Sequence, residues 1–296
     1  MEMLKHKKLF LLISFLVIAS GLIFGFTKGF KFDIDFKGGT RIQLDLGETY
    51  NESDVKEVVK TVTGEIPLVQ TSSSSENGIT ITTNVITEEK SNEVVAALNS
   101  KYINMGEATV RNVQASYGKE LIETTVIAAI VAIILLFIYI VVRFKVLGVA
   151  AALSAVCALV HDMLVMVAIY AFLQLPINAT FVAVVLTILG YSINDTIVIF
   201  DRIRENTKRN MKTKTLLETI NLSLYQSLKR TLYTSITTVI AVLILFIFAK
   251  VYDQQVLQEF SLPLIIGLVA GTYSSMFIAP TLLYYFTKIH KKFKKA

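Results

Sequence analysis

The sequence is poor in charged residues and in the side chains that build disulfides and metal sites. Only 18% of its 296 residues are charged, whereas soluble domains carry about 25%, and there is no tryptophan. The one cysteine, Cys157, lies in an apolar run, which excludes an intrachain disulfide framework and a cysteine-rich metal site. Three scattered histidines, His6, His161 and His290, argue against a zinc centre built on histidine. We therefore expect no metal site and no other cofactor.

Apolar residues are instead abundant, at 53% of the chain with a mean hydropathy of +0.59. A bilayer core is crossed by about 20 predominantly apolar residues in helical form. The sequence contains six runs of roughly this length, which predicts a multispanning α-helical membrane protein rather than an ordinary soluble enzyme. The six expected spans are 9–26, 124–142, 146–172, 175–200, 231–249 and 260–286.

The first run resembles a secretory signal in one respect, because Lys5, Lys7 and Lys8 precede it. Its apolar part is long for a signal core, however, and no clean small-x-small cleavage site follows it. Five further spans also favour a retained anchor. We interpret this run as the first span.

The basic residues predict how the chain is oriented, because Lys and Arg are enriched in cytoplasmic loops. Of the 29 Lys and Arg, 18 fall in the N-terminus, the loop after the second span, the segment 202–230 and the C-terminal tail. The opposite side holds 11 Lys and Arg together with 17 Asp and Glu. Both termini are therefore expected in the cytoplasm. We interpret the basic charges as topology signals and lipid contacts rather than as a nucleic-acid site.

This orientation divides the chain into an N-terminus with the first span, an extracytoplasmic head domain, five further spans, a cytoplasmic loop between the fourth and fifth spans, and a basic cytoplasmic tail. The expected ranges are 1–27, 28–118, 119–287, 201–230 and 288–296, with the second span beginning as early as 119 and the sixth ending near 287.

The segment 28–118 is long enough to fold as a domain of its own. The expected strands are 41–46, 66–71, 79–86 and 107–115, and the expected helices are 52–63 and 88–104. Asn51 or Ser53 can cap the first helix, Gly64 can end it, and residues 72–78 are typical of a flexible turn. The order βαββαβ predicts a ferredoxin-like α+β head, and nothing in it has a catalytic pattern.

The fourth span contains a charged residue where the bilayer opposes one. Thr187, Tyr191 and Asp195 recur every four residues and therefore share one polar stripe, with Asn194 beside them. Asp195 lies about 9 Å deeper than Asp201, at 1.5 Å per residue, so it needs a partner, water or a proton. Burial favours the protonated carboxyl and a nearby cation favours the ionised form. Two readings remain open: a group that loads and releases protons, or a permanent Asp–Arg pair that fixes packing.

Two other spans carry polar groups. Asp162 in the third span lies on a face of small residues, whereas His161 points elsewhere, and Asp162 is either a proton-path group or a hydrogen-bonded packing group. In the fifth span, Arg230 shares a face with Thr234. The Arg230 side chain either reaches inward toward Asp195 or extends to the lipid headgroups.

Two further helical patterns indicate packing surfaces. Gly267, Gly271 and Ser275 recur at four-residue spacing in the sixth span and predict a flat seam for another helix. Between the fourth and fifth spans, apolar residues recur every four positions from Leu216 to Leu228. This second pattern predicts a helix lying on the cytoplasmic membrane surface.

At these positions the sequence resembles the SecF family, membrane subunits that work with SecD beside the bacterial Sec translocon. The segment 191–206 (YSINDTIVIFDRIREN) is similar to the fourth-span signature of that family, and 35–39 (DFKGG) is similar to its motif at the entry to the head. Three more segments fit in order, so the resemblance covers essentially the whole chain: His161 with Asp162, 230–238 (RTLYTSITT) and 271–275 (GTYSS). One departure is 113–121 (VQASYGKEL), where the family often has Gly-Pro after the valine, which predicts a different hinge between head and second span.

The resemblance implies a six-helix half of an RND-type bundle, with SecD supplying the pseudo-symmetric other half. It implies an accessory subunit, not an enzyme, that uses the proton or sodium motive force to promote late steps of protein export across the bacterial cytoplasmic (inner) membrane. The implied partners are SecD, the SecYEG translocon with the associated YajC, and the translocating unfolded polypeptide, which the head helps to draw outward.

The resemblance also implies roles for residues. The family's coupling carboxylate corresponds to Asp195, which would accept the proton, and its fifth-span arginine corresponds to Arg230, which would tune or replace that proton. The expected ion-coupling residues are Asp195, Arg230, Asn194, Thr187, Thr234 and Asp162.

Three other functions are compatible with parts of the sequence. An intramembrane aspartyl protease needs two carboxylates that share a proton, which Asp162 and Asp195 on neighbouring spans could provide. Such enzymes place glycine before one aspartate, whereas Ile193 and Asn194 precede Asp195 here. A small-molecule or lipid exporter of the RND type usually carries two large outside domains and about twice the spans in one chain. A purely structural partner subunit is the third alternative.

Overall fold

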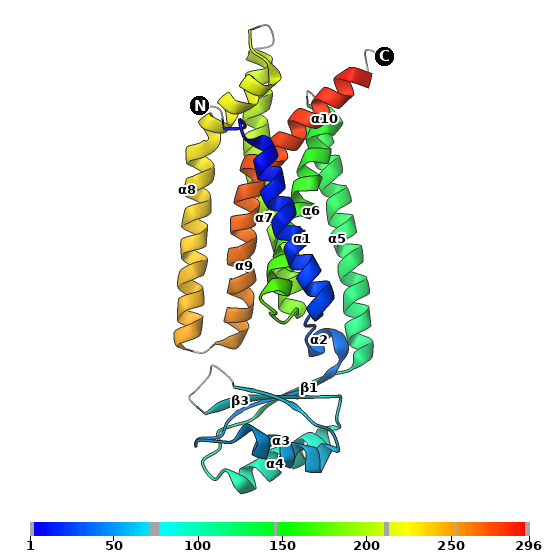
Figure 1. Ribbon diagram of the computed structural model, residues 1–296, viewed down its shortest axis with the longest axis vertical. Coiled ribbons are helices and arrows are strands. Elements are labelled where there is room, and N and C mark those ends of the chain that lie inside the picture. Colours follow the sequence, from blue (N-terminus) through cyan, green and yellow to red (C-terminus); the bar gives the residue numbers. More distant parts are fainter. Residues whose placement is uncertain (1–2, 72–76, 145–146, 210–212, 253, 294–296) are drawn as a thin grey trace.

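The computed structural model describes residues 3–71, 77–144, 147–209, 213–252 and 254–293. It consists of a long helical bundle with a small α/β head at one end (Figure 1). The beginning of the first helix and the end of the last both lie at the end of the bundle opposite the head. Most of the expected turn 72–78, the first residue of the expected third span and residues 294–296 of the tail lie outside the described residues.

Within the described residues, six helical segments are long and apolar enough to cross a membrane, which confirms the expected multispanning architecture. The sixth segment consists of α9, a π-helical turn called η1, and α10. The helices of the bundle are α1 (Lys7–Lys28), α5 (Ala115–Arg143), α6 (Gly148–Phe172), α7 (Ala179–Arg209), α8 (Leu216–Val251), α9 (Gln255–Tyr273), η1 (Ser274–Ile278) and α10 (Ala279–Phe293).

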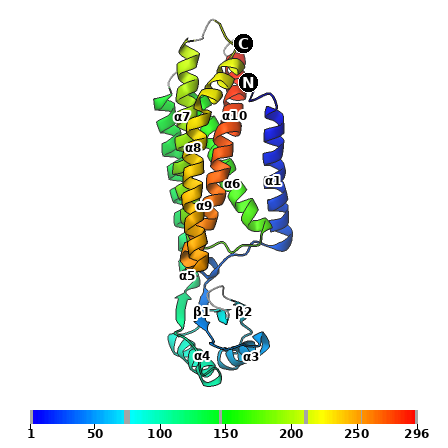
Figure 2. The same cartoon turned by 90° about the vertical axis from the view of Figure 1, so that its left-hand side faces the viewer.

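The bundle has inner and outer helices. In the most apolar stretch of α6, of α7 and of the α9–α10 segment, 50%, 44% and 56% of the residues are buried. The corresponding shares are 17% in α1, 6% in α5 and 17% in α8. Figure 2 shows α1 at one edge of the bundle. The outer helices therefore present broad apolar faces to their surroundings, as membrane helices do.

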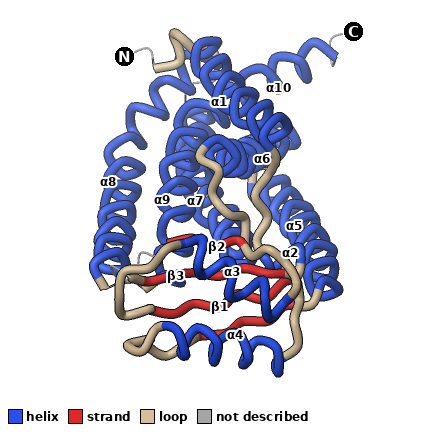
Figure 3. Tube along the Cα trace, turned by 60° about the horizontal axis from the view of Figure 1, so that its bottom comes forward, coloured by secondary structure: helices blue, strands red, loops and turns tan. Residues whose placement is uncertain are grey.

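The head is a four-stranded antiparallel sheet with strand order β2-β3-β1-β4 and two helices on one face. Figure 3 shows α3 and α4 on the side of the sheet that faces away from the bundle. This topology confirms the expected βαββαβ arrangement, and the strand ends differ from the expected ones by up to three residues. The elements are β1 (Gly39–Asp45), α3 (Glu52–Thr63), β2 (Leu68–Thr71), β3 (Gly78–Thr83), α4 (Glu88–Lys101) and β4 (Thr109–Val113).

Local signals explain why the head helices begin and end where they do. The Asn51 side chain accepts a hydrogen bond from the Ser53 N–H at the start of α3, and Gly64 ends that helix in the left-handed region at φ +82°. The apolar stripes of both helices pack on alternate residues of β1 and β3, such as Ile42 and Ile81, to form a core separate from that of the bundle. The head therefore has the core of an independent domain.

A short helix, α2 (Ile34–Lys37), joins α1 to the head and was not expected from the sequence. Asp33 caps it, since its carboxylate accepts a hydrogen bond from the Ile34 N–H at 2.8 Å. Gly38 ends it at φ +75°, a conformation that favours glycine. A four-residue helix has no periodicity that a hydropathy pattern could reveal.

The structure corrects the expected surface helix in the segment 201–230. No glycine or proline interrupts the sequence from 216 to 251, so the segment and the fifth span form one continuous helix, α8. Its apolar stripe covers the bundle instead of the membrane surface, because Ile220 and Leu224 are buried in the same cluster as Phe200 and Ile203.

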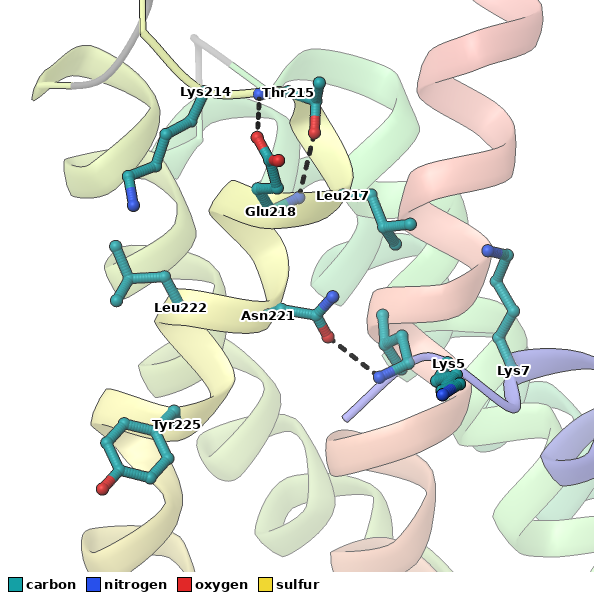
Figure 4. Close-up of a pocket in the computed structure, with 10 residues that line it drawn as sticks. Lys5, Lys7, Lys214, Thr215, Leu217, Glu218, Asn221, Leu222 and Tyr225 are labelled. Atoms are coloured by element: carbon teal, nitrogen blue, oxygen red, sulfur yellow. Dashed lines mark hydrogen bonds between the residues drawn. The ribbon is translucent and has the colours of Figure 1, made fainter. Parts of the chain in front are cut away.

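The N-terminal segment contributes to this arrangement (Figure 4). The backbone N–H of Leu4 donates to Oδ1 of Asn221 at 2.8 Å, which ties the chain before α1 to the second turn of α8. Thr215 and Glu218 form a capping box at the start of α8. A cavity of about 590 Å³ opens beside these residues, with Tyr225 at its wall.

Close helix contact in the bundle depends on small residues. A β-carbon at Gly21 of α1 would overlap the backbone carbonyl of Ala168 on α6. Gly190 on α7 offers a contrast, because a β-carbon there would meet no heavy atom within 4 Å. The α1–α6 contact therefore requires glycine at position 21 for steric reasons.

We expect Gly21→Ala to lower the free energy of unfolding of the detergent-purified chain by about 1–3 kcal/mol, because the added methyl group must push α1 away from α6. Gly190→Ala is the matched control and should leave the stability unchanged or raise it, since alanine favours a helix more than glycine does. Unfolding in mixed micelles measures both. Equal stabilities of the two variants would contradict this account of the contact.

Candidate functional site

Asp195 lies where three helices of the bundle meet. Its side chain is buried, with 6% of the residue exposed, and Oδ2 accepts a hydrogen bond from Ser235 Oγ of α8 at 3.2 Å. Ser235 Oγ in turn accepts from Thr272 Oγ1 of α9 at 2.8 Å. Ser235 is the one side chain that donates to Asp195 in the described part of the chain. Since a carboxylate can accept about four hydrogen bonds, this one keeps acceptor capacity for a proton or a cation.

Arg230 lies on α8, five residues before Ser235, and its side chain is exposed. Between described residues, no ion pair within 4.0 Å joins Arg230 to Asp195, although the two charges attract each other across the gap. Arg230 instead lines a shallow cavity of about 440 Å³ together with Asp201 and Arg202. The permanent, tight Asp–Arg pair considered from the sequence is thus absent between these two residues.

Asp162 is fully buried and bonded on both carboxylate oxygens. Oδ2 accepts from Ser192 Oγ of α7 at 2.6 Å and from Ser274 Oγ of η1 at 2.9 Å. Nδ1 of His161 lies 3.1 Å from Oδ1, so the expectation that His161 points elsewhere is wrong. Adjacent helical side chains diverge by about 100°, but the long imidazole side chain can turn back to the carboxylate. These bonds tie α6, α7 and η1 together.

The His161 ring extends this network to the first helix. Nε2 lies 2.9 Å from Ser14 Oγ on α1, and the ring stacks on Tyr273 with centroids 6.1 Å apart. Asp162 and Asp195 do not bond to each other, since their partners are the side chains described above. The shared-proton pair that an aspartyl protease requires is therefore not formed by these two carboxylates.

The π-helical turn η1 brings Ser274 to Asp162. In it the Ala279 N–H donates to the Ser274 carbonyl, five residues back, in place of the usual four. Pro280 follows directly and cannot donate to the carbonyl four residues before it, which disrupts the α-helical ladder at this point. Pro280 is the one sequence signal that pointed to an irregularity here.

Gly267, Gly271 and Ser275 line the contact of the sixth span with α7. A β-carbon at Gly271 would lie 3.0 Å from the Ser192 β-carbon, and one at Gly267 would lie 2.5 Å from Ile188 Cγ1. Ser275 Oγ donates to the Ser192 carbonyl at 3.1 Å. The two helices are therefore in direct contact along this seam.

Thr187, Asn194 and Thr234 lie on exposed faces of α7 and α8. Thr187 and Thr234 donate to carbonyls of their own helices, and no hydrogen bond between described residues joins any of the three to Asp195. At about 100° per residue, Thr187 and Asn194 point within about 20° of each other, whereas Asp195 is turned by about 80° from Thr187. The polar stripe expected from the four-residue spacing therefore divides into an exposed part, with Thr187 and Asn194, and a buried part, with Asp195.

Tyr191 connects these two parts, and sequence reasoning gave it no role. Its hydroxyl donates to Thr238 Oγ1 of α8 at 3.1 Å and so links α7 to α8 about one helical turn before Asp195. The signal in the sequence that could have indicated this contact was the position of Tyr191 in the polar stripe.

Across the residues that the structure describes, no group of three or more His, Cys, Asp or Glu side chains is placed to hold a metal ion.

Comparison with known proteins relates this geometry to a family. Residues 93–289 match the sequence model of the family described as "Protein export membrane protein SecD/SecF, C-terminal". The chain is 33% identical to the protein translocase subunit SecF of Sebaldella termitidis, over 100% of this chain and 93% of that protein. It is 32% identical to the protein of the same name from Haemophilus influenzae, over 96% of this chain and 85% of that one.

Two solved structures of SecDF are similar in fold. The translocon-associated SecDF of Thermus thermophilus superimposes with a TM-score of 0.81 at 28% identity, over 93% of this chain and 37% of that one. SecDF in a super-membrane-facing form gives a TM-score of 0.67 at 27% identity, over 99% of this chain and 39% of that one. The chain thus spans little more than a third of the SecDF chains.

The network around Asp162 yields a stability prediction. Ser192→Ala and Ser274→Ala each remove one donor to a buried carboxylate, so each should lower the free energy of unfolding of the isolated chain by about 1–3 kcal/mol. Ser20→Ala is the matched control, because Ser20 is an exposed membrane-helix serine whose partner among the described residues is a carbonyl of its own helix. If the three variants unfold alike in mixed micelles, the network does not hold the helices together.

Proposed function

Because the chain belongs to the SecF family of protein translocase subunits, we propose that it works with SecD to convert an ion gradient into late steps of protein export. The observation that carries this proposal is the environment of Asp195, a buried carboxylate between three helices with one side-chain donor among the described residues. Asp162 provides the comparison within the same protein, since three side chains already satisfy it. Asp195 is accordingly the coupling group, and Asp162 holds the helices around it.

The energetic scale is adequate for such coupling. One elementary charge that crosses 100 mV supplies about 2.3 kcal/mol. The ionised Asp195 attracts Arg230, and protonation or cation binding removes that attraction. The exposed Arg230 side chain is free of a tight ion pair with Asp195 and can therefore move when the carboxylate changes charge. The contact of α7 with α8 would then have two arrangements.

The distribution of charge supports an orientation. Most of the Lys and Arg fall in the termini, the loop after the second span and the segment 202–230. The start of α1 and the ends of α7 and α10 lie at the end of the bundle opposite the head, which supports a cytoplasmic location for that end. The head then lies on the extracytoplasmic side of the cytoplasmic membrane, with both termini inside. We accordingly keep the division into first span, extracytoplasmic head, five further spans, cytoplasmic loop and cytoplasmic tail as part of this proposal.

A polar strip on the outer surface of the bundle supports SecD as a partner. Thr187, Asn194 and Thr234 are exposed on α7 and α8, and Arg230 continues the strip toward the cytoplasm. Amide and guanidinium groups are costly next to lipid chains. The strip is therefore the face that SecD covers. The matching part makes up little more than a third of the SecDF chain, so the rest of that chain is long enough to include a SecD half.

The remaining partners follow from the family and from one described relative. The Thermus thermophilus SecDF is described as translocon-associated. We extend this association to the present chain, with SecYEG and YajC as partners and an unfolded polypeptide as the client. The head, whose sheet faces the bundle, would bind the emerging polypeptide and help draw it outward.

Asp195→Asn tests the coupling role, because it keeps the size and an acceptor oxygen but cannot gain or lose a proton at working pH. In membrane vesicles that contain SecD and this chain, we expect export of a model precursor to fall to the rate seen without an imposed ion gradient. Asp201→Asn is the control from the same helix, since Asp201 is ion-paired with Arg143 at 2.7 Å, and it should keep the gradient response. A gradient response that survives in Asp195→Asn would transfer coupling to another group.

Photo-crosslinking tests the SecD face. A benzoylphenylalanine at Thr187 or Asn194 should form an adduct with SecD in the assembled complex. Ile127 on α5 is the control position, because it is 62% exposed on an apolar face and should crosslink to no protein. Adducts with SecD at Ile127 and none at the two polar positions would place the partner on the other side of the bundle.

A further inference from the structure

The junction between head and bundle contains a carboxylate that caps a helix from a distant part of the chain. Asp35 of α2 is 2% exposed, and its Oδ2 accepts a hydrogen bond from the backbone N–H of Ala179 at 2.8 Å. Ala179 is the first residue of α7, the helix that carries Asp195. The two ends of this bond are 144 residues apart in the sequence.

Asp35 supplies the carboxylate that accepts directly from the first N–H of α7. The first turn of α7 contains no acidic residue, and Asn178 supplies the local cap by accepting from the Phe181 N–H at 2.9 Å. The N–H groups at the start of a helix lack partners within the helix, and a carboxylate near them is stabilising. Asp35 therefore accepts from a backbone N–H of α7 that has no partner within the helix.

The same carboxylate faces the head. Its Oδ1 lies 2.9 Å from Nη2 of Arg111 on β4. The preceding acid, Asp33, pairs with Arg41 of β1. The backbone reinforces this junction, because the Asp33 N–H donates to the Ile177 carbonyl at 2.9 Å, in the loop before α7.

A second chain of contacts joins the start of α7 to the head through α9. Nδ2 of Asn178 donates to Oε2 of Glu259 at 2.6 Å, and Oε1 of Glu259 accepts from Gln255 at 2.9 Å. Oε1 of Gln255 accepts from Gln43 of β1. Two chains of contacts therefore connect the start of α7 to the head. The one through Asp35 reaches β4, and the one through Glu259 and Gln255 reaches β1.

The backbone of α2 cannot yield easily. A β-carbon at Gly118 of α5 would overlap the Phe36 carbonyl, and one at Gly38 would lie 2.7 Å from the Ala115 nitrogen. The short helix is thus packed directly against the start of α5. A displacement of α7 either breaks the bond to Asp35 or carries α2 and the strands with it.

We propose that Asp35 is a positioning residue that transmits movement of α7 to the head. This inference rests on the proposed function, in which the charge of Asp195 sets the position of α7. It assigns to the DFKGG segment the task of coupling the membrane helix to the extracytoplasmic domain. The Asp35 carboxylate does this by holding the first N–H of α7 and Arg111 of β4 at once.

Export in vesicles with SecD provides the first test, with and without an imposed gradient. Asp35→Ala should reduce the gradient response to the level of Asp195→Asn, and the double variant should be no worse than Asp195→Asn alone, because both residues act on one route. Asp35→Asn keeps an oxygen for the Ala179 N–H and should retain a larger response than Asp35→Ala. Asp54→Asn is the control, since Asp54 is an exposed head carboxylate 3.6 Å from Lys101, and it should behave as the unaltered chain.

The position of the head provides a second test in the purified complex with SecD. Spin labels at Asn99 of α4 and Lys250 of α8, in a Cys157→Ser chain, report the distance between head and bundle. Asp195→Asn should shift this distance, and the shift should vanish when Asp35→Ala is also present. A merely structural role of Asp35 would alter stability without removing the response to Asp195. Arg111→Gln leaves the cap intact and should also abolish the shift, so the test survives if Asp35→Ala fails to assemble.

The outcomes separate this inference from the function on which it rests. A gradient response that is lost in Asp195→Asn but kept in Asp35→Ala overturns the transmission role alone. Additive losses in the double variant, or a head distance that still follows Asp195 in Asp35→Ala, do the same. A gradient response that persists in Asp195→Asn overturns the proposed function and this inference with it.

Discussion

A carboxylate inside a bilayer has to be hydrogen-bonded, paired or protonated, because the hydrocarbon supplies no donors. The bundle meets this constraint in two ways. Asp162 is satisfied by Ser192, Ser274 and His161, and these bonds join α6, α7 and η1 to one another. Among the described residues, Asp195 accepts a side-chain hydrogen bond from Ser235 alone, and in the proposed function a proton or a cation supplies the rest.

The difference between the two carboxylates explains how a rigid interior and a responsive surface coexist. The seam of small residues on α9 and the serine donors around Asp162 hold the inner helices together. The outer helix α8 meets α7 through the hydrogen bonds of Ser235 and of the Tyr191 hydroxyl, through the Asn206–Ser223 hydrogen bond, and through buried apolar residues such as Leu224. In the proposed function, a change of charge at Asp195 acts first on its hydrogen bond to Ser235. The inner helices are held well enough to move as one unit.

The sequence was most informative where a single periodic signal decides the structure. Six apolar runs predicted the six membrane segments, and alternating and helical periods predicted the order of the head. The continuity of α8 was missed because a surface helix ending at Leu228 and a span beginning at 231 were expected separately, whereas no glycine or proline separates them. The partner of His161 and the capping of α7 by Asp35 depend on contacts between distant segments, which no local pattern encodes. The charges of Asp195 and Arg230 were enough to identify them as candidates, but the sequence could not predict that the two side chains form no close ion pair.

The π-helical turn at Ser274–Ile278 makes the spacing along the sixth span sensitive to chain length. Such a turn holds one residue more than an α-helical turn of the same rise. Deleting a single residue there would leave a regular α-helical turn with the following residues still in register, whereas a deletion in the α-helical part before it would rotate everything that follows by about 100°. Thr281 and Leu283, both fully buried, would leave the interior only in the second case. The turn is therefore the point of the sixth span where the chain length can change by one residue without loss of the packed bundle, and a hydropathy profile would not distinguish it from its neighbours.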